Sequence, residues 1–522
     1  MKVLLISIDP YLTTAIGVRT ISNYIKKNGI SVKCLFLALS DEITYKDKFK
    51  PIIKKIQPHL IAQMADFINK EGFSVVGMSF MTVGYGIAKQ LTGDLKKKIN
   101  IPIVWGGIHP TVCPDECLKT VSAICLGEGE EAFLEYIDNV KQGKYFLHSK
   151  NMWFKNGDEI IRNPVSLNSS SLDKIATQDY DYSDHYLFHE GQLVGMDESL
   201  LYNYMPHWMG RESICYLVEG SRGCSFKCTY CFNSKSRFLY DNKFRVRTRS
   251  VDTIIDDLKN IKTRLEKITH VFFQDEVFLA QRNADEVTYF CEQYKKYIAL
   301  PFSIVTHAYG VTDEIICKLA NAGLFTIQVG LQSASKETCS KVYNRVSDEN
   351  KYLNAAKIFK RYSDTVVPIY DIILDNPYEK DSDLIATLNF LQKLPHPREI
   401  RLYSLTLFPG TLLYDRFKSE HGLSDKEMAK KFYSNNYNKI NYWKYINNIF
   451  LLLHILNNTQ VDWLIKMRRN LIFKPFIMML FLLLHKRIYI AENRVYQFLK
   501  FRIKKIMKLQ ILLPEMSRYE KV

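Results

Sequence analysis

Three cysteines lie close together near the middle of the sequence. Cys224, Cys228 and Cys231 form a C-x3-C-x2-C pattern directly after a predicted strand. Three thiolates at this spacing can hold three irons of a [4Fe-4S] cluster and leave the fourth iron open for a ligand that is not protein. A structural zinc site needs a fourth Cys or His at short spacing, and none follows Cys231. The pattern therefore predicts one iron–sulfur cluster with three protein ligands.

The cysteines lie within a long series of alternating strands and helices. From residue 211 to residue 424, the apolar pattern predicts strands that are separated from one another by helical stretches. The predicted strands are Ile214–Glu219, His270–Gln274, Phe302–Thr306, Thr326–Val329, Val367–Leu374 and Glu399–Leu407. Recurring strand–helix units are typical of a full or partial β/α barrel, so we expect the cysteines to follow the first strand of such a barrel.

Residues 1–140 form a separate series of strands and helices. Strands are predicted at Val3–Ile8, Val32–Leu37, Ser74–Phe80, Ile103–Trp105 and Ala123–Leu126, with helices at Thr14–Asn28, Gly86–Lys98 and Gly129–Val140. This alternation predicts an α/β domain with a parallel, doubly wound, Rossmann-like sheet. Ligands of such sheets bind beyond the carboxyl ends of the strands, where this sequence places Ser79, Gly106, Gly107, Gly127, Glu128 and Gly129. Taken alone, the domain predicts either a ligand site there or a surface for interaction or dimerisation.

Residues 211 to about 420 resemble the radical S-adenosylmethionine (SAM) superfamily beyond the three cysteines. The segments that carry the resemblance are Phe244–Arg247, Phe273–Glu276, Gly330–Ser333, Asp371–Glu379 and Phe408–Thr411. Asp375 and Tyr378 replace two glycines of the family's D-x-I-x-G-x-P-G-E segment, and Gln332 replaces the glutamate of its G-I-E-S segment. The resemblance implies a [4Fe-4S] cluster and SAM as cofactors, with Asp275, Gln332 and Ser333 contacting SAM.

Placed before such a core, residues 1–140 resemble the cobalamin-binding domain of the B12-dependent branch of this superfamily. The resemblance rests on the turns Gly106–Thr111 and Gly127–Glu130. It implies that cobalamin is contacted by Ser79, Gly106, Gly107, His109, Gly127, Glu128 and Gly129. Cobalamin mutases carry a cobalt-binding histidine after the first strand, but Tyr11 stands there in this sequence. We therefore expect no histidine from the Asp9–Thr14 loop on cobalt. His109 as a substitute ligand, and a second cluster on Cys113, Cys117 and Cys125, remain as alternatives.

Together, these resemblances imply a cobalamin-dependent radical SAM enzyme. In this family a 5′-deoxyadenosyl radical derived from SAM removes hydrogen from the substrate, and methylcobalamin supplies a methyl group. The implied activity is C-methylation of an unactivated carbon, or methylation of phosphorus, in a small-molecule, lipid or peptide substrate, with a flavodoxin- or ferredoxin-type electron donor. The alternatives are a cyclisation, rearrangement or oxidation in tetrapyrrole, lipid or natural-product biosynthesis, and a non-catalytic cobalamin or iron–sulfur sensor. The sequence assigns no individual residue a catalytic role.

Residues 141–210 lack steady periodicity and are predicted to be a connector, whereas residues 425–522 are basic and apolar. This C-terminal tail has 19 Lys and Arg against 6 Asp and Glu, so it holds 13 of the net 16 positive charges of the 522-residue chain. Because the charge is concentrated there, the sequence does not predict a nucleic-acid binder as a whole. The sequence leaves three interpretations of the tail. It can form a helical cap on the barrel, a peripheral contact with an anionic membrane surface, or a site for an acidic or nucleic-acid substrate. No apolar run in it reaches the roughly 20 residues of a spanning helix.

The N-terminus runs directly into a predicted strand and shows no secretory signal. A cytoplasmic protein is therefore expected, located at the inner membrane face if the tail binds lipid. The eleven cysteines are then expected to be thiols or metal ligands and not disulfides.

Overall fold

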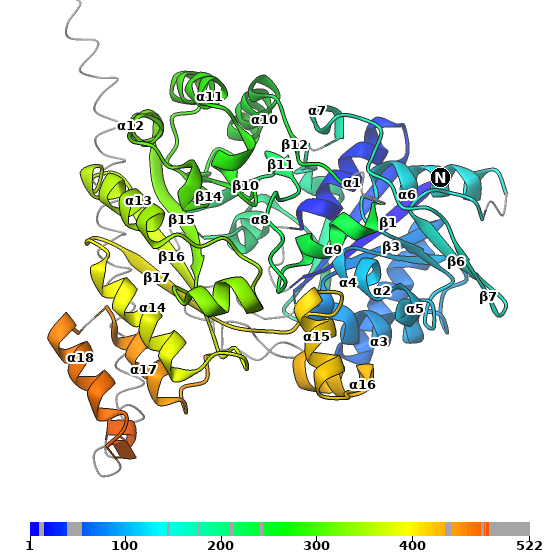
Figure 1. Cartoon of the computed structure of the whole chain (residues 1–522). Coiled ribbons are helices and arrows are strands. Elements are labelled where there is room, and N and C mark those ends of the chain that lie inside the picture. Colours follow the sequence, from blue (N-terminus) through cyan, green and yellow to red (C-terminus); the bar gives the residue numbers. More distant parts are fainter. Residues whose placement is uncertain are drawn as a thin grey trace, which may run out of the picture.

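Two largely parallel β-sheets, one in each half of the chain, organise the fold (Figure 1). The computed structural model describes residues 1–9, 15–38, 55–143, 147–175, 177–207, 213–240, 244–433, 440–454, 456–470, 474–475 and 477–479. The first sheet belongs to the blue and cyan domain in Figure 1, and the second belongs to the green and yellow barrel beside it.

The centre of the first sheet is the predicted doubly wound domain. Its parallel strands are β1 (Lys2–Asp9), β2 (Ser31–Ala38), β3 (Val75–Phe80), β4 (Ile103–Gly106) and β5 (Ala123–Cys125), in the order β5-β4-β3-β1-β2. The helices are α1 (Ile16–Lys27), α2 (Pro58–Glu71), α3 (Tyr85–Leu95), α4 (Ile108–Val112), α5 (Pro114–Cys117) and α6 (Glu130–Lys141). The strand order reverses beside β1, which is the position where sheets of this class bind ligands. The predicted fold class is confirmed.

Residues 141–210 differ from the predicted connector because they extend the first sheet at both edges. The hairpin β6 (Met152–Asn156) and β7 (Glu159–Arg162) adds to β5, and the hairpin β8 (His185–His189) and β9 (Gln192–Gly195) adds to β2. The segment also contains the short helices α7 (Leu172–Ile175) and α8 (Glu198–Tyr204). The edge strands β7 and β9 contain no fully buried residue, so they lack the apolar run that marks the central strands, and the sequence predicted no structure here.

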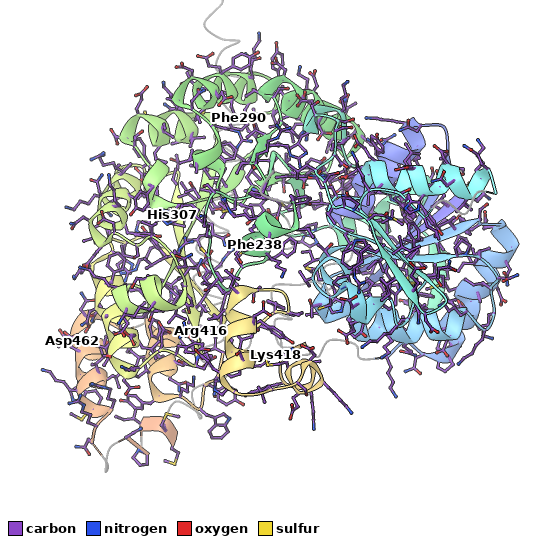
Figure 2. All side chains as sticks on the ribbon, turned by 45° about the vertical axis from the view of Figure 1, so that its right-hand side comes forward. Phe238, Phe290, His307, Arg416, Lys418 and Asp462 are labelled. Atoms are coloured by element: carbon purple, nitrogen blue, oxygen red, sulfur yellow. The ribbon has the colours of Figure 1, made fainter. Side chains whose placement is uncertain are left out.

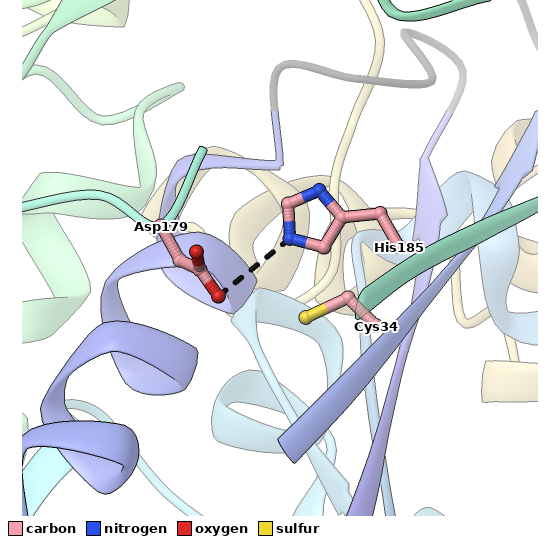
Figure 3. A group of neighbouring side chains, drawn as sticks. All are labelled: Cys34, Asp179 and His185. Carbon is pink, nitrogen blue, oxygen red and sulfur yellow. Dashed lines mark ion pairs between the residues drawn. The ribbon is translucent and has the colours of Figure 1, made fainter. Parts of the chain in front are cut away.

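A cluster of buried polar side chains connects this extension to the first sheet. Figure 3 shows Asp179 and His185 of the extension beside Cys34 of β2. The Asp179 carboxylate accepts a hydrogen bond of 2.6 Å from Ser22 on α1 and lies 2.9 Å from the ammonium of Lys26. Burial alone would raise the pKa of Asp179, but interactions with His185, Ser22 and Lys26 hold it well below its usual range.

We expect Asp179→Asn to lower the free energy of unfolding by about 3 kcal/mol, because the change removes one partner of a buried ion pair. Urea denaturation at pH 7 measures this difference. Asp181→Asn is the matched control, since Asp181 lies in the same loop but is exposed, and its carboxylate accepts a hydrogen bond from Ser183. A loss below about 1 kcal/mol for Asp179→Asn would show that the buried pair does not hold the extension.

The second sheet is a partial barrel of six parallel strands in sequential order. The strands are β10 (Cys215–Val218), β13 (His270–Phe273), β14 (Phe302–Thr306), β15 (Leu324–Gln332), β16 (Val367–Leu374) and β17 (Glu399–Ser404). Its outer helices are α10 (Val251–Arg264), α11 (Ala284–Tyr297), α12 (Asp313–Ala322), α13 (Glu349–Arg361) and α14 (Asp381–Lys393). Within the described residues β10 and β17 do not pair with each other, so the barrel stays open. The predicted strands are confirmed to within a few residues of their ends.

The part of the C-terminal tail that the structure describes packs on the barrel. After α15 (Leu412–Glu420) and α16 (Asp425–Met428), the helices α17 (Tyr445–Leu452) and α18 (Asn458–Met467) lie beside α14 (Figure 1). Ile449 and Phe450 of α17 are fully buried in the core shared with the barrel. The first half of the tail is therefore a helical cap, as one alternative predicted, while residues 480–522 lie outside the described residues. No described helix is long and apolar enough to cross a bilayer.

Candidate functional site

A pocket of about 400 Å³ lies where the first sheet faces the barrel. On one side are the carboxyl ends of β3, β4 and β5, and on the other is α9 (Phe232–Leu239), the helix that begins directly after Cys231. Figure 1 shows α9 between the two halves of the molecule, and Figure 2 places its Phe238 in the same region. The pocket lining includes Ser79, Gly106, Gly107, Gly127, Glu128 and Gly129, which are six of the seven residues predicted to contact cobalamin.

The floor of the pocket is formed by backbone at two glycine turns. Gly107 has φ +93°, and a Cβ atom there would lie 2.9 Å from the backbone N and O of Phe80. Gly127 has φ +68°, and a Cβ atom there would lie 2.6 Å from the hydroxyl of Tyr240. Side chains therefore cannot be accommodated at these turns, and a bulky, flat ligand can approach the main chain directly.

Part of the pocket lining is apolar. It includes Leu5, Val18, Ile21, Val104 and Phe133 from the first domain. Gly77 also lines the pocket, and a Cβ atom there would be 2.9 Å from both Leu5 and Phe133. Apolar side chains together with glycine turns suit a large, partly apolar ligand, so the residues present fit cobalamin.

A charged network joins the two halves at the rim of the pocket. Arg222, on β11 (Ser221–Arg222), lies 2.7 Å from Glu130 and 2.9 Å from Glu219. Arg247, on β12 (Arg247–Thr248), forms an ion pair with Glu128. Burial would raise the pKa of Glu130, but the adjacent Arg222 guanidinium lowers it below its usual value. Ion pairs between the domains thus connect residues that line the pocket from both sides.

His109, the seventh predicted cobalamin contact, is not among the residues that line the pocket. It lies on α4 and is fully buried, with its Nδ1 3.3 Å from the hydroxyl of Thr82 and its ring 4.4 Å from the ring of Tyr85. Burial lowers the pKa of His109 to about 4, so the imidazole is neutral at pH 7. The turn places this side chain away from the cavity. Of the Asp9–Thr14 loop, Pro10 to Thr14 lie outside the described residues.

The three cysteines of the C-x3-C-x2-C pattern lie in the loop between β11 and α9. Cys224 and Cys228 are buried and Cys231 is partly buried. Burial raises the pKa of Cys224 to about 11 and that of Cys231 to about 12, so iron must displace protons when it binds. Three thiols in one buried loop suit the thiolate ligand set of an iron–sulfur cluster.

Two arginines surround the cysteine loop. Arg345 donates a hydrogen bond of 3.2 Å to the sulfur of Cys228 and another to the carbonyl of Gly330 at the end of β15. Arg237 donates to the backbone carbonyls of Cys224 and Ser225 at 3.1 and 2.9 Å. Both guanidinium groups therefore place positive charge next to the loop that carries the three cysteines. Sequence reasoning missed Arg345, which follows its strand by a dozen residues without a recognisable spacing.

The three residues predicted to contact SAM lie at the carboxyl ends of β13 and β15. Asp275 is buried and paired with Arg282 at 3.1 Å. Gln332 ends β15 with φ +69°, and the hydroxyl of the adjacent Ser333 donates to Glu379 at 2.9 Å. The strand ends therefore bring these residues to the same end of the barrel as the cysteine loop, although Asp275 and Ser333 already have protein partners there.

Comparison with known proteins finds matches for both halves of the chain. The sequence model of the radical SAM superfamily matches residues 218–391, and that of the B12 binding domain matches residues 1–137. An uncharacterized methyltransferase of Pyrococcus horikoshii is 24% identical over 386 residues, which cover 72% of this chain and 73% of the relative. The anaerobic magnesium-protoporphyrin IX monomethyl ester cyclase of Rubrivivax gelatinosus is 22% identical over 329 residues, covering 60% of this chain and 51% of the cyclase.

Two solved structures share the fold over 80% and 99% of the chain. The radical SAM methyltransferase TsrM from Kitasatospora setae, with tryptophan and a SAM analogue bound, has a TM-score of 0.60 at 14% identity, covering 80% of this chain and 76% of TsrM. The cobalamin-dependent SAM radical enzyme OxsB, with aqua-cobalamin and SAM bound, has a TM-score of 0.62 at 14% identity, covering 99% of this chain and 81% of OxsB. The chain therefore combines an N-terminal B12-binding domain with a radical SAM domain, and these two domains imply a [4Fe-4S] cluster, SAM and cobalamin as cofactors.

Proposed function

We propose that this radical SAM enzyme transfers a methyl group to an unactivated carbon, or to phosphorus, of a small-molecule, lipid or peptide substrate. The observation that carries the proposal is the pocket that joins the glycine turns of the B12-binding domain to α9, the helix following Cys231. Gly223 and Phe232, which flank the cysteine loop, line this pocket, so a methyl carrier held there would lie next to the radical source, and the two could act in turn on one substrate atom. The similarity to a methyltransferase over 72% of this chain supports the same activity.

The residues of the chain have separate tasks in this proposal. When bound, the cluster and SAM supply the radical, and cobalamin supplies the methyl group. Cys224, Cys228 and Cys231 hold three irons, and Arg345, which contacts the Cys228 sulfur, offers a cation beside them for a carboxylate such as that of SAM. The backbone at Gly107 and Gly127 would let cobalamin approach the main chain closely, and the apolar side chains of the pocket lining would exclude water.

The test is a reaction of the anaerobically reconstituted enzyme with SAM carrying a trideuterated methyl group. Electrons are supplied by flavodoxin and its reductase, the class of electron donor we propose, with dithionite as a comparison. Formation of 5′-deoxyadenosine together with a substrate mass gain of about 17 Da, three of them from deuterium, supports methyl transfer. Failure to form 5′-deoxyadenosine with either reductant contradicts the enzyme proposal and favours a cobalamin or iron–sulfur sensor.

The alternative is a cyclisation, rearrangement or oxidation that uses the same cofactors. The observation that favours it is the match to the Rubrivivax cyclase over 60% of this chain. The same labelling experiment separates the two, because a cyclase forms 5′-deoxyadenosine but leaves no deuterium from SAM in the product.

We expect cobalt in the bound cobalamin to lack a histidine ligand. Tyr11 stands at the position of the mutase histidine, and His109 is packed between Thr82 and Tyr85 and outside the pocket lining. EPR of the cob(II)alamin form should therefore lack the nitrogen superhyperfine splitting of an axial imidazole. Clear splitting in the wild type that disappears in His109→Gln would contradict this prediction.

We expect the basic tail to bind anionic membranes weakly, as a peripheral contact. Each Lys or Arg near such a surface contributes about 1 kcal/mol, and the tail holds 13 net positive charges, of which 7 lie in residues 480–522. Full-length protein should co-sediment with anionic liposomes at low salt and be released at high salt, whereas a chain truncated after residue 479 should stay in solution. This truncation keeps the described cap helices. Equal behaviour of both proteins would leave the tail as a structural cap only.

A further inference from the structure

A group of metal-ligating side chains lies behind the pocket floor, outside the proposed cobalamin and cluster sites. One potential ligand atom each from His109, Cys113 and Glu116 lies within 4.8 Å of the other two. His109 belongs to α4, Glu116 belongs to α5, and Cys113 is the residue at which these two short helices meet. The spacing H-x3-C-x2-E therefore brings the three side chains together without a contribution from a distant part of the chain.

The surroundings of His109 orient its ring. The ring lies 5.9 Å from that of Phe80 and 4.4 Å from that of Tyr85, measured between centroids, and its Nδ1 is 3.3 Å from the Thr82 hydroxyl. A histidine that binds a metal through one nitrogen commonly has its other nitrogen held in this way. Cys113 and Glu116 are only partly buried, which leaves a path for an ion from solvent.

We propose that His109, Cys113 and Glu116 bind a divalent transition-metal ion of the zinc type. Nitrogen, sulfur and carboxylate oxygen are the three donors that Zn²⁺ accepts in proteins, and three protein ligands leave a fourth position for water. Binding releases the thiol proton of Cys113 to solvent, and the metal changes no oxidation state. Mg²⁺ and Ca²⁺, which require oxygen ligands, do not suit this set.

A second group, Cys34, Asp179 and His185, meets the same distance criterion but has a different environment. Its carboxylate already lies 2.9 Å from the ammonium of Lys26, and Arg19 lies 3.4 Å from Nδ1 of His185 (Figure 3 shows the three side chains). Cations at these distances compensate the charge of the carboxylate and repel a metal ion. This group serves as a matched control for the proposed site.

The proposed ion would stiffen the floor of the cobalamin pocket. Thr111, two residues after His109, donates to the carbonyl of Gly107 at 2.8 Å and accepts from the backbone N–H of Gly127 at 2.9 Å. Helix α4 thus connects both glycine turns, and an ion that fixes α4 to α5 restrains both turns together. The binding of the ion itself does not depend on the proposed methyl transfer.

The experiment uses the full chain with Cys224, Cys228 and Cys231 replaced by alanine, so that the cluster ligands cannot bind the probe. Titration with Co²⁺ should saturate at about one equivalent and produce a thiolate-to-cobalt charge-transfer band that Zn²⁺ abolishes. Adding Cys113→Ser or Glu116→Gln should weaken Co²⁺ binding by at least about tenfold, and Cys113→Ser should remove the band. Adding Cys34→Ser should change neither the affinity for Co²⁺ nor the charge-transfer band.

A second measurement avoids the triple variant and any folding defect it has. The cobalamin- and cluster-loaded wild-type enzyme, dialysed against metal-free buffer, should retain about one zinc per chain by mass spectrometry, and Cys113→Ser should retain less than about one tenth. The proposal would be overturned if the wild-type enzyme retained less than about one tenth of a zinc per chain. It would also be overturned if zinc were lost in Cys34→Ser but kept in Cys113→Ser.

Discussion

Replacement of Cys224, Cys228 and Cys231 by alanine is expected to reduce bound iron to less than about one tenth of the wild-type value and to abolish 5′-deoxyadenosine formation. The three thiols lie in one loop, and two of them are buried, so each removed sulfur leaves an iron without a protein ligand. Iron content and the visible absorption of the reconstituted protein measure the first effect, and chromatography of the reaction with SAM and dithionite measures the second.

The control for this prediction is Cys291→Ala. Cys291 is buried on α11 in the same half of the molecule, away from the cysteine loop. The Cys291→Ala variant should be somewhat less stable than the wild type, because a buried thiol is removed, but it should bind the same amount of iron. Cobalamin binding should be retained in both proteins, since the glycine turns are untouched. A triple variant that holds four irons and still cleaves SAM would contradict the assignment of the cluster ligands.

The parts of the fold that could be predicted from the sequence are those with long, regular patterns. Strands such as β16, buried at every position from Val367 to Leu374, give a long run between helical segments that is apolar except at Asp371. The C-x3-C-x2-C pattern is local, so its three residues share a loop whatever the rest of the fold. The hairpins β6–β7 and β8–β9 could not be predicted, because their outer strands contain no fully buried residue and therefore give no apolar run. Their attachment to the sheet joins residues far apart in the sequence, such as Cys34 and His185.

Residues that depart from the family pattern can be understood only with the structure. Asp375 stands where the family has glycine and has φ +60°. Its carboxylate accepts hydrogen bonds from Ser404 at 2.9 Å and Asn447 at 2.8 Å, and it lies 3.3 Å from the ammonium of Lys444. The strained backbone is thus offset by contacts that attach the cap helices to the end of β16.

The second glycine replacement has a similar explanation. The hydroxyl of Tyr378 donates to Glu420 at 2.6 Å, and the guanidinium of Arg416 lies 4.5 Å from the centre of its ring. Both partners belong to α15. No pattern in the sequence relates residues 375 and 378 to segments 40 to 70 positions later, so long-range contacts of this kind stay hidden until the fold is known.

Gly107→Ala is expected to weaken cobalamin binding by at least about a hundredfold while iron content stays at the wild-type level. Gly107 has φ +93°, which is a conformation that other residues adopt at a cost of about 1–3 kcal/mol, and its Cβ would lie 2.9 Å from the backbone of Phe80. Backbone atoms at the end of β3 cannot move aside as a flexible side chain can, so the turn itself must shift into the pocket. Hydroxocobalamin affinity, measured by quenching of tryptophan fluorescence, reports the change.

Gly93→Ala is the matched control for this substitution. Gly93 lies within α3, and a Cβ atom there would meet nothing within 4 Å. Alanine in a helix is more favourable than glycine by about 1 kcal/mol, so this variant should be slightly more stable and bind cobalamin as the wild type does. Unchanged iron in Gly107→Ala separates a local effect on the pocket from general unfolding, because the cysteine loop lies in the other half of the chain. If Gly107→Ala binds hydroxocobalamin with wild-type affinity, the glycine turn is not the floor of the cobalamin site.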